Sequence, residues 1–598
     1  MCGIVGYICN DKNAKNVILN NLKKLEYRGY DSAGVCFFDN NKFDIHKSIG
    51  EIKNLEKILN ATILSNCGIA HTRWATHGKV CLQNTHPHLS NDKNWCVVHN
   101  GIIENYLELK KFLKSKHIKF AGESDTEVVP NLLSVYNSPN ILYCIQQTVD
   151  KLVGSFAFCI INKSQKDTLY LVRKKSPLYV SCTKDSVLSC SDPVCFGENY
   201  KEYYALPENC ICVAKKGKVE FFDFDLNKLN VEKQKVGVFE KTASKGAFEY
   251  FAQKEIAEIP FVLKNLLKNY EETNYLNKIN FKFLKNITNI KFIGCGTSYH
   301  ACLIGAKYIQ SKTNIECTAH IASEFRYSKP IINKNTLCIF ASQSGETADT
   351  LLCLKLAKQK KAKTISLVNV PYSSLAKQSN VMLPLCAGME IAVISTKAYN
   401  SMLFVFYMLS VHLHNILYNK NIDYIKKLKS LCKIDFFKNS NNLDYISKIV
   451  TKSEKIFFIG KGEDYVSALE AGLKLKEITY INCVSLPSGE LKHGTLALVD
   501  NNSTIFVIAT KKETLYKNLA SASEIKSRGG HIILLTNLKI DNTFLSDIDF
   551  VYYFDKTNEE LSSMVSIVPF QILAVKTCLS LNLNPDKPRN LAKSVTVE

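Results

Sequence analysis

The chain has 598 residues, of which 46% are hydrophobic and 22% charged, with a formal net charge of +21. This length predicts several domains, and the composition is that of a soluble globular protein rather than a disordered or fibrous one. Only six arginines occur, so lysine supplies nearly all of the positive charge without basic and aromatic residues gathered together, and we expect no nucleic acid partner.

The 22 cysteines are spread along the chain, with no CxxC pair and no His/Cys cluster at zinc spacing. We therefore expect reduced thiols, no disulfides and no metal site. No secretory signal pattern opens the chain. The stretch most like a membrane span, residues 401–417, is interrupted by His412 and His414 and falls short of the ~20 apolar residues required. We expect a buried core helix there, no membrane and a cytoplasmic protein.

Residues 1 to about 230 contain many short apolar segments separated by turns rich in Asn, Asp, Lys and Gly. Residues 3–8, 34–38, 96–99 and 155–162 are examples, and the pattern predicts sheet packed on sheet with covering helices. This first domain is expected over 1–230. The polar, lysine-rich segment 231–247 is predicted to be a linker, and an amphipathic helix is predicted over 248–268.

An internal repeat fills most of the remaining chain. KFIGCGTSYHACLIGAKYI (residues 291–309) aligns with IFFIGKGEDYVSALEAGLKLK (residues 456–476), each an apolar strand, a Gly-x-Gly turn and a helix. A second strand and helix follow in each copy. This alternation predicts two parallel, doubly wound sheets, which we place at 248–435 and 436–585. Ligands bind such sheets outside the carboxyl ends of the strands, where both Gly-x-Gly turns fall.

The first chemical signal is Cys2. Once Met1 is removed, as the small residue behind it favours, Cys2 carries a thiol and a free α-amine. Their unperturbed pKa values lie near 8.5 and 7.7–8.0, so the amine can accept the thiol proton near neutral pH. Taken alone, the signal leaves open an inert cysteine that acts as a small hydrophobe.

Four motifs follow in order, LEYRGYDSAG (25–34), HTRWATHG (71–78), HNGIIEN (99–105) and ESDTEV (123–128). With Cys2 they resemble the N-terminal-nucleophile glutamine amidotransferases. The resemblance implies an α+β, four-layer αββα glutaminase domain in which Cys2 attacks the side-chain amide of glutamine. It also implies an oxyanion hole from Asn100 and Gly101, binding of the glutamine α-carboxylate by Arg73 and α-ammonium by Asp125, a site lined by Thr76 and His77, a loop supported by Arg28, and an ammonia gate at Trp74.

Each of these motifs has an ordinary structural alternative when it is taken singly. Arg73 could form a surface ion pair, His71 and His77 could be core histidines, and Asn100-Gly101 could be a hairpin turn. Four motifs in order behind Cys2 favour the glutaminase interpretation.

In the first repeat, CGTS (295–298) and SQSGET (342–347) each follow a strand and open a helix. Hydroxyl groups and free N–H groups at a helix N-terminus suit a phosphate, and no Walker lysine occurs. The pair resembles the sugar isomerase domain, although helix caps without a ligand are the alternative. The resemblance implies a phosphosugar bound by Thr297, Ser298, Ser342, Gln343, Ser344 and Thr347, with Val393 and Ser395 at the sugar.

The second repeat lacks this cradle but carries other chemistry. Lys474 and Glu477 lie three residues apart on one helix face, and His493 follows in SGELKHG. The resemblance implies that Glu477 moves the proton between C1 and C2, that Lys474 assists, and that His493 promotes ring opening. For the helix alone, a solvated stripe of Glu470, Lys474 and Glu477 is the alternative.

The ending PRNLAKSVTVE (588–598) completes the pattern. The whole chain resembles the glutamine–fructose-6-phosphate aminotransferases (isomerizing), whose Schiff-base lysine falls at Lys593. An amine condenses best with a ketose when burial lowers its pKa, so the tail, 586–598, is predicted to pack between domains. The resemblance implies glutamine and fructose 6-phosphate as substrates, no metal or organic cofactor, and at least a homodimer in which the partner subunit supplies the ring-opening histidine.

Two rival functions are weaker. A phosphoribosyl-transferring enzyme with the same front half needs an acidic pyrophosphate loop, which we do not find. A phosphosugar sensor would be marked by loss of Cys2, Glu477 or Lys593, and all three are present. The chain departs from the family at Tyr250 and Ala252, more often His and Met, and has Thr495 where proline is more usual; none is an expected catalytic group.

Overall fold

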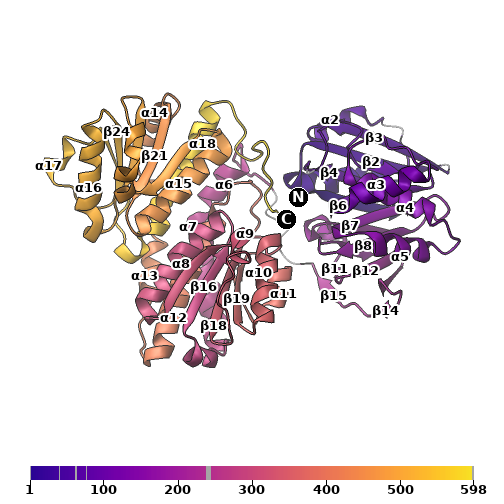
Figure 1. Ribbon diagram of the computed structural model, residues 1–598, viewed down its shortest axis with the longest axis horizontal. Helices are drawn as coiled ribbons and strands as arrows, with labels where there is room; N and C mark the ends of the chain where they lie inside the picture. The colour runs from indigo at the N-terminus through magenta and orange to yellow at the C-terminus, as the bar shows by residue number, and fades with distance from the viewer. Residues whose placement is uncertain (1, 40, 61–62, 76, 237–243, 596–598) are drawn as a thin grey trace. The chain divides into compact units, whose positions relative to one another are not determined.

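The computed structural model describes residues 2–39, 41–60, 63–75, 77–236 and 244–595. Contacts within the chain divide it into two compact units. The first comprises Met1–Ala243 with Ala592–Glu598, and the second comprises Ser244–Leu591. In Figure 1 the N-terminal part of the first unit runs from indigo to magenta, and the second unit runs from there to yellow.

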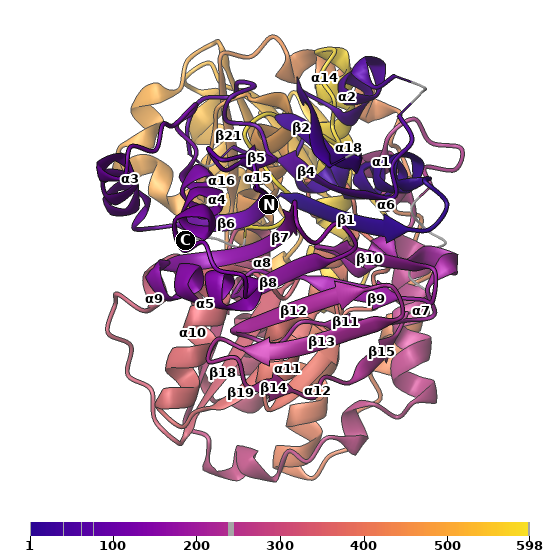
Figure 2. The same cartoon turned by 90° about the vertical axis from the view of Figure 1, so that its right-hand side faces the viewer.

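The first unit contains two antiparallel sheets, whose strands face the viewer in Figure 2. The eight-stranded sheet has the order β15-β11-β9-β10-β1-β4-β2-β3, and the seven-stranded sheet has the order β14-β13-β12-β8-β7-β6-β5. The strands are β1 (Gly3–Cys9), β2 (Ser32–Asp39), β3 (Lys42–Ile49), β4 (Cys67–Arg73), β5 (His88–Leu89), β6 (Trp95–Ile103), β7 (Gly154–Asn162), β8 (Leu169–Lys174), β9 (Tyr179–Cys182), β10 (Ser186–Cys190), β11 (Glu202–Ala205), β12 (Cys210–Lys215), β13 (Lys218–Asp223), β14 (Lys228–Leu229) and β15 (Lys233–Lys235).

Apolar side chains from both sheets fill the space between them. Ile4, Ile69, Val98 and Leu171, one from each of four strands, are fully buried in this core. Helices cover the outer faces: α1 (Ala14–Leu25) and α2 (Ile52–Ile58) on the first sheet, and α3 (Tyr106–Ser115), α4 (Val128–Val135) and α5 (Ile141–Lys151) over the second. The αββα layering expected from the sequence is confirmed.

Strand β15 falls inside the segment that the sequence suggested was a linker, 231–247. Its three residues pair with β11 and extend the eight-stranded sheet, so the linker prediction is wrong for residues 233–235. Charged side chains are tolerated on an edge strand, and such a strand resembles a solvated linker in the sequence. Residues 237–243 lie outside the described part of the chain.

The single helix predicted over 248–268 is two helices. Helix α6 (Phe251–Ala257) ends at Glu258, and α7 (Ile259–Glu272) starts anew with Pro260 in its first turn. Proline has no N–H to donate to the preceding turn, so it begins a helix more readily than it continues one.

The second unit contains two parallel five-stranded sheets, ordered β17-β16-β18-β19-β20 and β22-β21-β23-β24-β25 (Figure 1). In both, the strand before the Gly-x-Gly turn lies between the second and third strands of its repeat, so the orders are the same. The doubly wound prediction is confirmed twice. The strands are β16 (Asn289–Gly294), β17 (Glu316–Ile321), β18 (Thr336–Ser342), β19 (Lys363–Val368), β20 (Val381–Pro384), β21 (Lys455–Gly460), β22 (Cys483–Pro487), β23 (Ser503–Ile508), β24 (His531–Thr536) and β25 (Phe550–Tyr553).

Helices flank both parallel sheets. They are α8 (Thr297–Thr313), α9 (Ala322–Phe325), α10 (Ala348–Gln359), α11 (Ser374–Gln378), α12 (Lys397–Tyr418), α13 (Ile425–Leu431), α14 (Asn442–Val450), α15 (Glu463–Thr479), α16 (Lys512–Lys526), α17 (Asn542–Leu545) and α18 (Ser562–Ser580). The longest, α12, contains the membrane-like stretch of the sequence. By length and composition, two helical segments in the described chain, Lys397–Tyr418 and Glu559–Ser580, could span a membrane, yet 67% and 89% of their apolar windows are buried inside the protein. Both pack as core helices.

Candidate functional site

Cys2 lies directly before β1 and contacts the loop after β4. The Trp74 backbone N–H donates to Cys2 Sγ at 3.3 Å, and Sγ lies 3.5 Å from the Trp74 carbonyl oxygen. Burial by the surrounding protein raises the pKa of the thiol, although the Trp74 N–H opposes the rise. The thiol is therefore protonated at neutral pH and needs a base to become a nucleophile.

Asn100 lies beside Cys2 and is oriented by a buried histidine. Its Nδ2 donates to the Cys2 carbonyl at 2.8 Å, and its Oδ1 lies 3.1 Å from His71 Nε2. His71 Nε2 also lies 2.8 Å from the His99 carbonyl. Both neighbours are acceptors, so the proton of the neutral ring is on Nε2. Burial, with His99 nearby, lowers the pKa of His71 to about 3 and keeps the ring neutral.

His71 is thus a core histidine, as one sequence alternative suggested, but it has a second effect. By holding Asn100 Oδ1, it directs the amide N–H groups of Asn100 toward Cys2. The sequence placed His71 in the motif with Arg73 and Trp74 without showing this contact, because residues 71 and 100 meet only through sheet packing.

Gly101 has the backbone geometry that only glycine adopts readily. Its φ is +136°, and a Cβ there would lie 1.9 Å from the Ser155 carbonyl oxygen. No other side chain fits without moving β7. The position leaves the Gly101 N–H next to Asn100, where both can serve one oxyanion.

The two residues expected to bind the α-carboxylate and α-ammonium of the substrate glutamine are buried. Arg73 donates to the carbonyl groups of His77 and Lys79, and Asp125 accepts the Ile103 N–H at 2.8 Å. His77 is half-buried, with its ring edge against Tyr106. Thr76, expected beside His77, lies outside the described residues.

Two residues of the LEYRGYDSAG motif make polar contacts near this part of the first unit. Arg28 forms an ion pair with Asp192 at 2.7 Å and donates to the Ser191 carbonyl, next to strand β1. The sequence assigned Arg28 to the loop of Thr76 and His77. Asp31, which the sequence did not single out, accepts the Ala75 N–H at 2.8 Å and so holds that loop directly. The position of Asp31 in the LEYRGYDSAG motif was the sequence feature that could have identified it.

The expected phosphate cradle lies in the second unit, where β16 and β18 end. Ser342 Oγ accepts the Gly345 N–H at 3.0 Å and lies 3.0 Å from Thr347 Oγ1, while Ser344 Oγ accepts the Glu346 N–H. These bonds fold SQSGET into a compact turn before α10. It faces the start of α8 across the point where the strand order reverses, the usual ligand crevice of such sheets. Ser298 and Gln343 are half-buried at its edge.

Thr297, also expected in the cradle, contacts the second repeat. Its hydroxyl donates to Glu470 at 3.0 Å and accepts from Lys474 Nζ at 3.0 Å, so both of its bonds go to α15. The His300 ring, one turn along α8, lies 2.6 Å from Glu470. The His300–Glu470 pair was not predicted from the sequence, because the two residues are 170 positions apart and lie on different helices.

Glu470, Lys474 and Glu477 form a charged row on one face of α15. Lys474 lies 3.4 Å from Glu470 and 2.8 Å from Glu477, and Glu470 and Lys474 are fully buried. The solvated stripe considered from the sequence is therefore wrong. Burial alone would lower the pKa of Lys474, but Glu470 and Glu477 outweigh it and raise the pKa. A protonated lysine consequently holds the Glu477 carboxylate in place.

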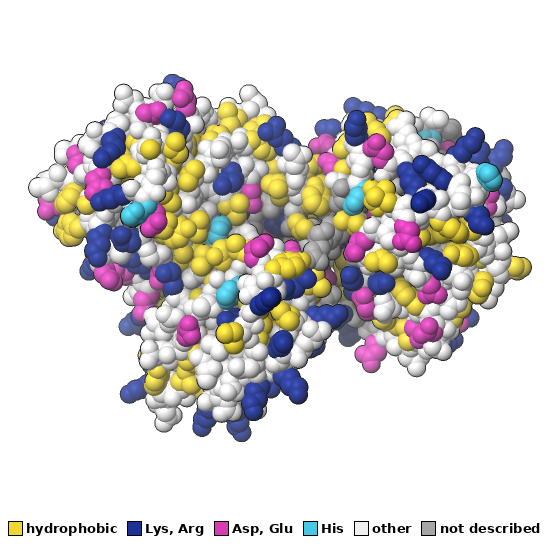
Figure 3. Space-filling view, viewed as in Figure 1, with side chains coloured by type: hydrophobic (Ala, Val, Ile, Leu, Met, Phe, Trp, Pro, Cys, Tyr) yellow, Lys and Arg dark blue, Asp and Glu magenta, His cyan; other side chains and the backbone are white. Residues whose placement is uncertain are grey.

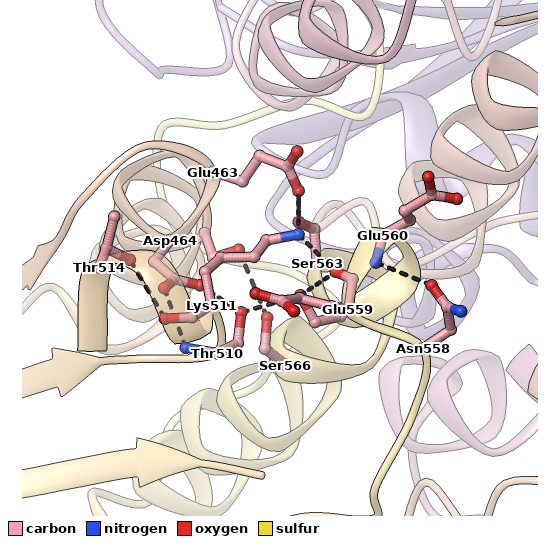
Figure 4. A network of polar contacts seen from close by, with 12 residues as sticks. Glu463, Asp464, Thr510, Lys511, Thr514, Asn558, Glu559, Glu560, Ser563 and Ser566 are labelled. Atoms are coloured by element: carbon pink, nitrogen blue, oxygen red, sulfur yellow. Dashed lines mark hydrogen bonds and ion pairs between the residues drawn. The ribbon is translucent and has the colours of Figure 1, made fainter. Parts of the chain in front are cut away.

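In the second repeat a carboxylate occupies the helix start. Asp464, at the position of Ser298 in the first repeat, accepts from the Thr510 N–H at 2.9 Å and from the Thr510 hydroxyl at 2.5 Å (Figure 4). Lys511 forms an ion pair with Glu463 at 2.6 Å. Burial raises the pKa of Asp464 to about 6. The Asp464 carboxylate thus joins the first turn of α15 to Thr510, which follows β23.

The remaining expected residues lie in three segments. Val393 and Ser395 are half-buried in a loop, where Ser395 Oγ donates to Glu390 at 3.2 Å. His493 is exposed at the end of the short helix Ser488–His493. Lys593 is half-buried in the described part of the tail, and Ala592–Glu598 groups with the first unit.

Across the described ranges, no three His, Cys, Asp or Glu residues converge as a metal site would require. Lys and Arg side chains are dispersed over the face shown in Figure 3.

Comparison with family models divides the chain as its two units do. A model described as a glutamine amidotransferase domain matches residues 71–197, and one described as a SIS domain matches residues 283–412 and 449–581. The second model matches twice, in agreement with the repeat.

Relatives of similar sequence span the full chain. The glutamine–fructose-6-phosphate aminotransferase (isomerizing) of Caldanaerobacter subterraneus subsp. tengcongensis is 39% identical over 615 residues, and that of Bacillus subtilis 34% over 613, with 100% of both chains covered in each case. The solved C-terminal domain of the Francisella tularensis glucosamine-fructose-6-phosphate aminotransferase matches with 31% identity and a TM-score of 0.53, covering 58% of this chain and 100% of that one. Tagatose-6-phosphate ketose/aldose isomerase from Escherichia coli shares the fold alone, with 17% identity, a TM-score of 0.51, and 59% and 98% coverage.

Proposed function

The chain belongs to the family of glutamine–fructose-6-phosphate aminotransferases (isomerizing), and from this premise we propose that Cys2, Glu477 and Lys593 carry out its chemistry. The enzyme converts fructose 6-phosphate and glutamine to glucosamine 6-phosphate and glutamate. The first unit supplies the glutaminase, and the second supplies the sugar isomerase.

In the first step the Cys2 thiolate attacks the side-chain amide carbon of glutamine. The α-amine exposed by removal of Met1 accepts the thiol proton and passes it to the departing ammonia, and water then hydrolyses the thioester to glutamate. The Asn100 amide and the Gly101 N–H receive the oxyanion. A preorganised donor of this kind lowers the barrier by about 2.7–4 kcal/mol.

Recognition of glutamine follows from the charges beside the nucleophile. Arg73 presents a planar fork to the α-carboxylate, and Asp125 presents a counter-charge to the α-ammonium. Thr76 and His77 line the site, Arg28 supports it and Trp74 gates ammonia. The Trp74 backbone N–H donates to Cys2 Sγ, and this position of Trp74 beside the nucleophile supports the last assignment.

In the second step Thr297, Ser298, Ser342, Gln343, Ser344 and Thr347 hold the sugar phosphate, with Val393 and Ser395 at the sugar. After His493 has promoted ring opening, the Lys593 amine condenses with the C2 carbonyl and water leaves. Ammonia displaces Lys593 from C2, and Glu477 then moves a proton from C1 to C2. The buried, protonated Lys474 supports this assignment, since it holds the Glu477 carboxylate.

The wider organisation is also a proposal. We infer a glutaminase domain near 1–230, isomerase domains near 248–435 and 436–585, and a catalytic tail at 586–598. A cytoplasmic homodimer, with His493 donated by the partner subunit, fits the exposed position of His493 in the single chain. No nucleic acid, membrane or cofactor has a part in it.

The observation that carries the glutaminase assignment is Cys2 Sγ at the Trp74 N–H, with Asn100 turned toward the same residue. The test is to incubate the purified protein with glutamine and fructose 6-phosphate and to quantify glutamate and glucosamine 6-phosphate. Cys2→Ala is compared with Cys182→Ala, which removes another half-buried thiol in the same unit.

Both products from wild type and Cys182→Ala, and neither from Cys2→Ala, are the expected result. Glutamate without amino sugar would mean that the sugar half acts on another substrate. Glutamate from Cys2→Ala would remove Cys2 from the mechanism.

A further inference from the structure

The C-terminal segment that leads to Lys593 begins at a buried carboxylate. Asp586 accepts hydrogen bonds from the Phe251 and Ala252 N–H groups, each at 2.8 Å, at the start of α6. Only 7% of Asp586 is exposed. The first N–H groups of a helix have no partner within it, so a carboxylate supplied by a distant segment satisfies them and is attracted by the helix dipole.

The same residue contacts the loop expected at the sugar. The Val393 N–H donates to the Asp586 carbonyl at 3.4 Å. Glu255, on α6, accepts from the neighbouring Ile391 and Ala392 N–H groups. Helix α6, the loop of Val393 and the base of the tail therefore form one junction, in which each segment hydrogen-bonds to another.

A second contact fixes the tail to the helix that carries the expected base. The Arg589 N–H donates to the Tyr480 hydroxyl at 2.8 Å, and the Arg589 guanidinium lies 4.1 Å from the centre of the Tyr480 ring. Tyr480 is the residue at which α15 ends, three positions after Glu477. Its backbone is left-handed, with φ of +63°, which turns the chain out of the helix there.

These two anchors restrict where Lys593 can lie. It follows Arg589 by four residues, and four extended residues span at most about 14 Å. With Arg589 held at the end of α15, the chain between this anchor and Lys593 is only that long. Without the anchors, the segment after α18 would behave as an ordinary chain terminus.

We propose that Asp586 and Tyr480 are positioning residues, which hold the base of the tail so that the Lys593 amine reaches the opened sugar. The inference rests on the proposed role of Lys593. Asp586 ties the tail to α6 and the sugar loop, and Tyr480 ties it to the end of the base-bearing helix. Neither side chain touches the reacting atoms.

The test is the rate at which fructose 6-phosphate is trapped on Lys593. The amine condenses with the C2 carbonyl, water leaves, and borohydride delivers hydride to C2, so that Nζ becomes a secondary amine. Mass spectrometry of the peptide containing Lys593 quantifies this adduct. Glutamate release from glutamine alone is measured in parallel and reports the first unit.

Four variants separate the contacts. Tyr480→Phe removes the hydroxyl acceptor but keeps the ring, whereas Arg589→Ala removes the guanidinium but keeps the backbone N–H. Asp586→Asn keeps one carbonyl oxygen and loses the charge. Tyr445→Phe removes an exposed hydroxyl elsewhere in the same unit and serves as the matched control.

Loss of one hydrogen bond predicts trapping slower by about 2- to 10-fold in Tyr480→Phe. Synthesis should lose kcat by a similar factor while the KM for fructose 6-phosphate stays constant, because the phosphate cradle is intact. Glutamate release and the thermal midpoint should match those of Tyr445→Phe.

Trapping at the wild-type rate in both Tyr480→Phe and Asp586→Asn would overturn the inference. A rise in KM with no change in kcat would also overturn it, since it would place the defect in sugar binding. If wild-type protein forms no adduct at Lys593, the proposed role of Lys593 fails, which is a different result.

Discussion

Replacing Lys474 with Met removes the only charge that Glu470 and Glu477 share on α15. Met has a similar length and volume, so the packing of the helix is largely kept and the change tests electrostatics. Lys474 Nζ lies 3.4 Å from Glu470 and 2.8 Å from Glu477. The variant leaves Glu470, which is fully buried, with only the Thr297 hydroxyl and the His300 ring as its described hydrogen-bond partners.

The distances give the scale of the effect. At an effective dielectric constant of about 20, the two attractions amount to about 5 and 6 kcal/mol, and the desolvation of each ion offsets several kcal/mol of this. Losing one member of a buried pair typically costs about 3–5 kcal/mol. We therefore expect Lys474→Met to lower the free energy of unfolding of the second unit by about 4 kcal/mol and Glu470→Gln by about 3 kcal/mol. The double variant should lose about 3 kcal/mol less free energy of unfolding than the sum of the two single variants, because neither buried charge is then left without its partner.

The tryptophans provide a convenient internal control. Both of them, Trp74 and Trp95, lie in the first unit, so tryptophan fluorescence during urea unfolding reports that unit. Far-ultraviolet circular dichroism reports both units. The substitutions should shift the dichroism transition and leave the fluorescence transition in place. Additive costs, within about 0.5 kcal/mol, would refute the pairing. A shift of the fluorescence transition would show that the effect is not local.

Three further outcomes are expected. Gly101→Ala should lower glutamate release by about 10²–10³-fold, because its Cβ meets the Ser155 carbonyl and displaces an oxyanion donor; release within tenfold of wild type would contradict this. The folded pKa of Asp464, about 6, lies above the unfolded 3.8, so stability is lost as pH rises through that range, by about 3 kcal/mol at pH 7. The urea midpoint of Asp464→Asn should therefore rise relative to that of wild type as the pH increases from 4 to 7, and a pH-independent difference would contradict this. Burial raises the pKa of Cys2, so its alkylation by iodoacetamide, followed by mass spectrometry, should accelerate about tenfold per pH unit from 7 to 9; a flat profile would show a thiolate already formed.

Most of the fold could be predicted because the periodicities are strong. The apolar strands before Gly296 and Gly462, each followed by a helix, identify both parallel sheets. The errors arose where the local signal was ambiguous. The lysines of β15 resemble a linker, and Pro260 interrupts an amphipathic pattern that continues on both sides of it.

The candidate site was predictable wherever its residues share a motif. Cys2, Asn100 and the SQSGET turn were found this way, and the first two are in contact in the structure. The partners that orient them come from distant segments: His71 on Asn100, and His300 on Glu470. No spacing rule connects residues 300 and 470, since their contact depends on how α8 and α15 pack.

The two isomerase repeats have the same strand order, yet their side-chain contacts differ, so one repeat could not replace the other. In the second copy the Asp464 carboxylate accepts from Thr510 of the same copy, and Glu470 hydrogen-bonds to Thr297 and His300 of the first copy. A second repeat without a carboxylate at position 470 would leave the Thr297 hydroxyl and the His300 ring of the first repeat without that partner. The effects of substitutions at 297, 300 and 470 on stability are therefore expected to be coupled, because these three side chains share one set of hydrogen bonds.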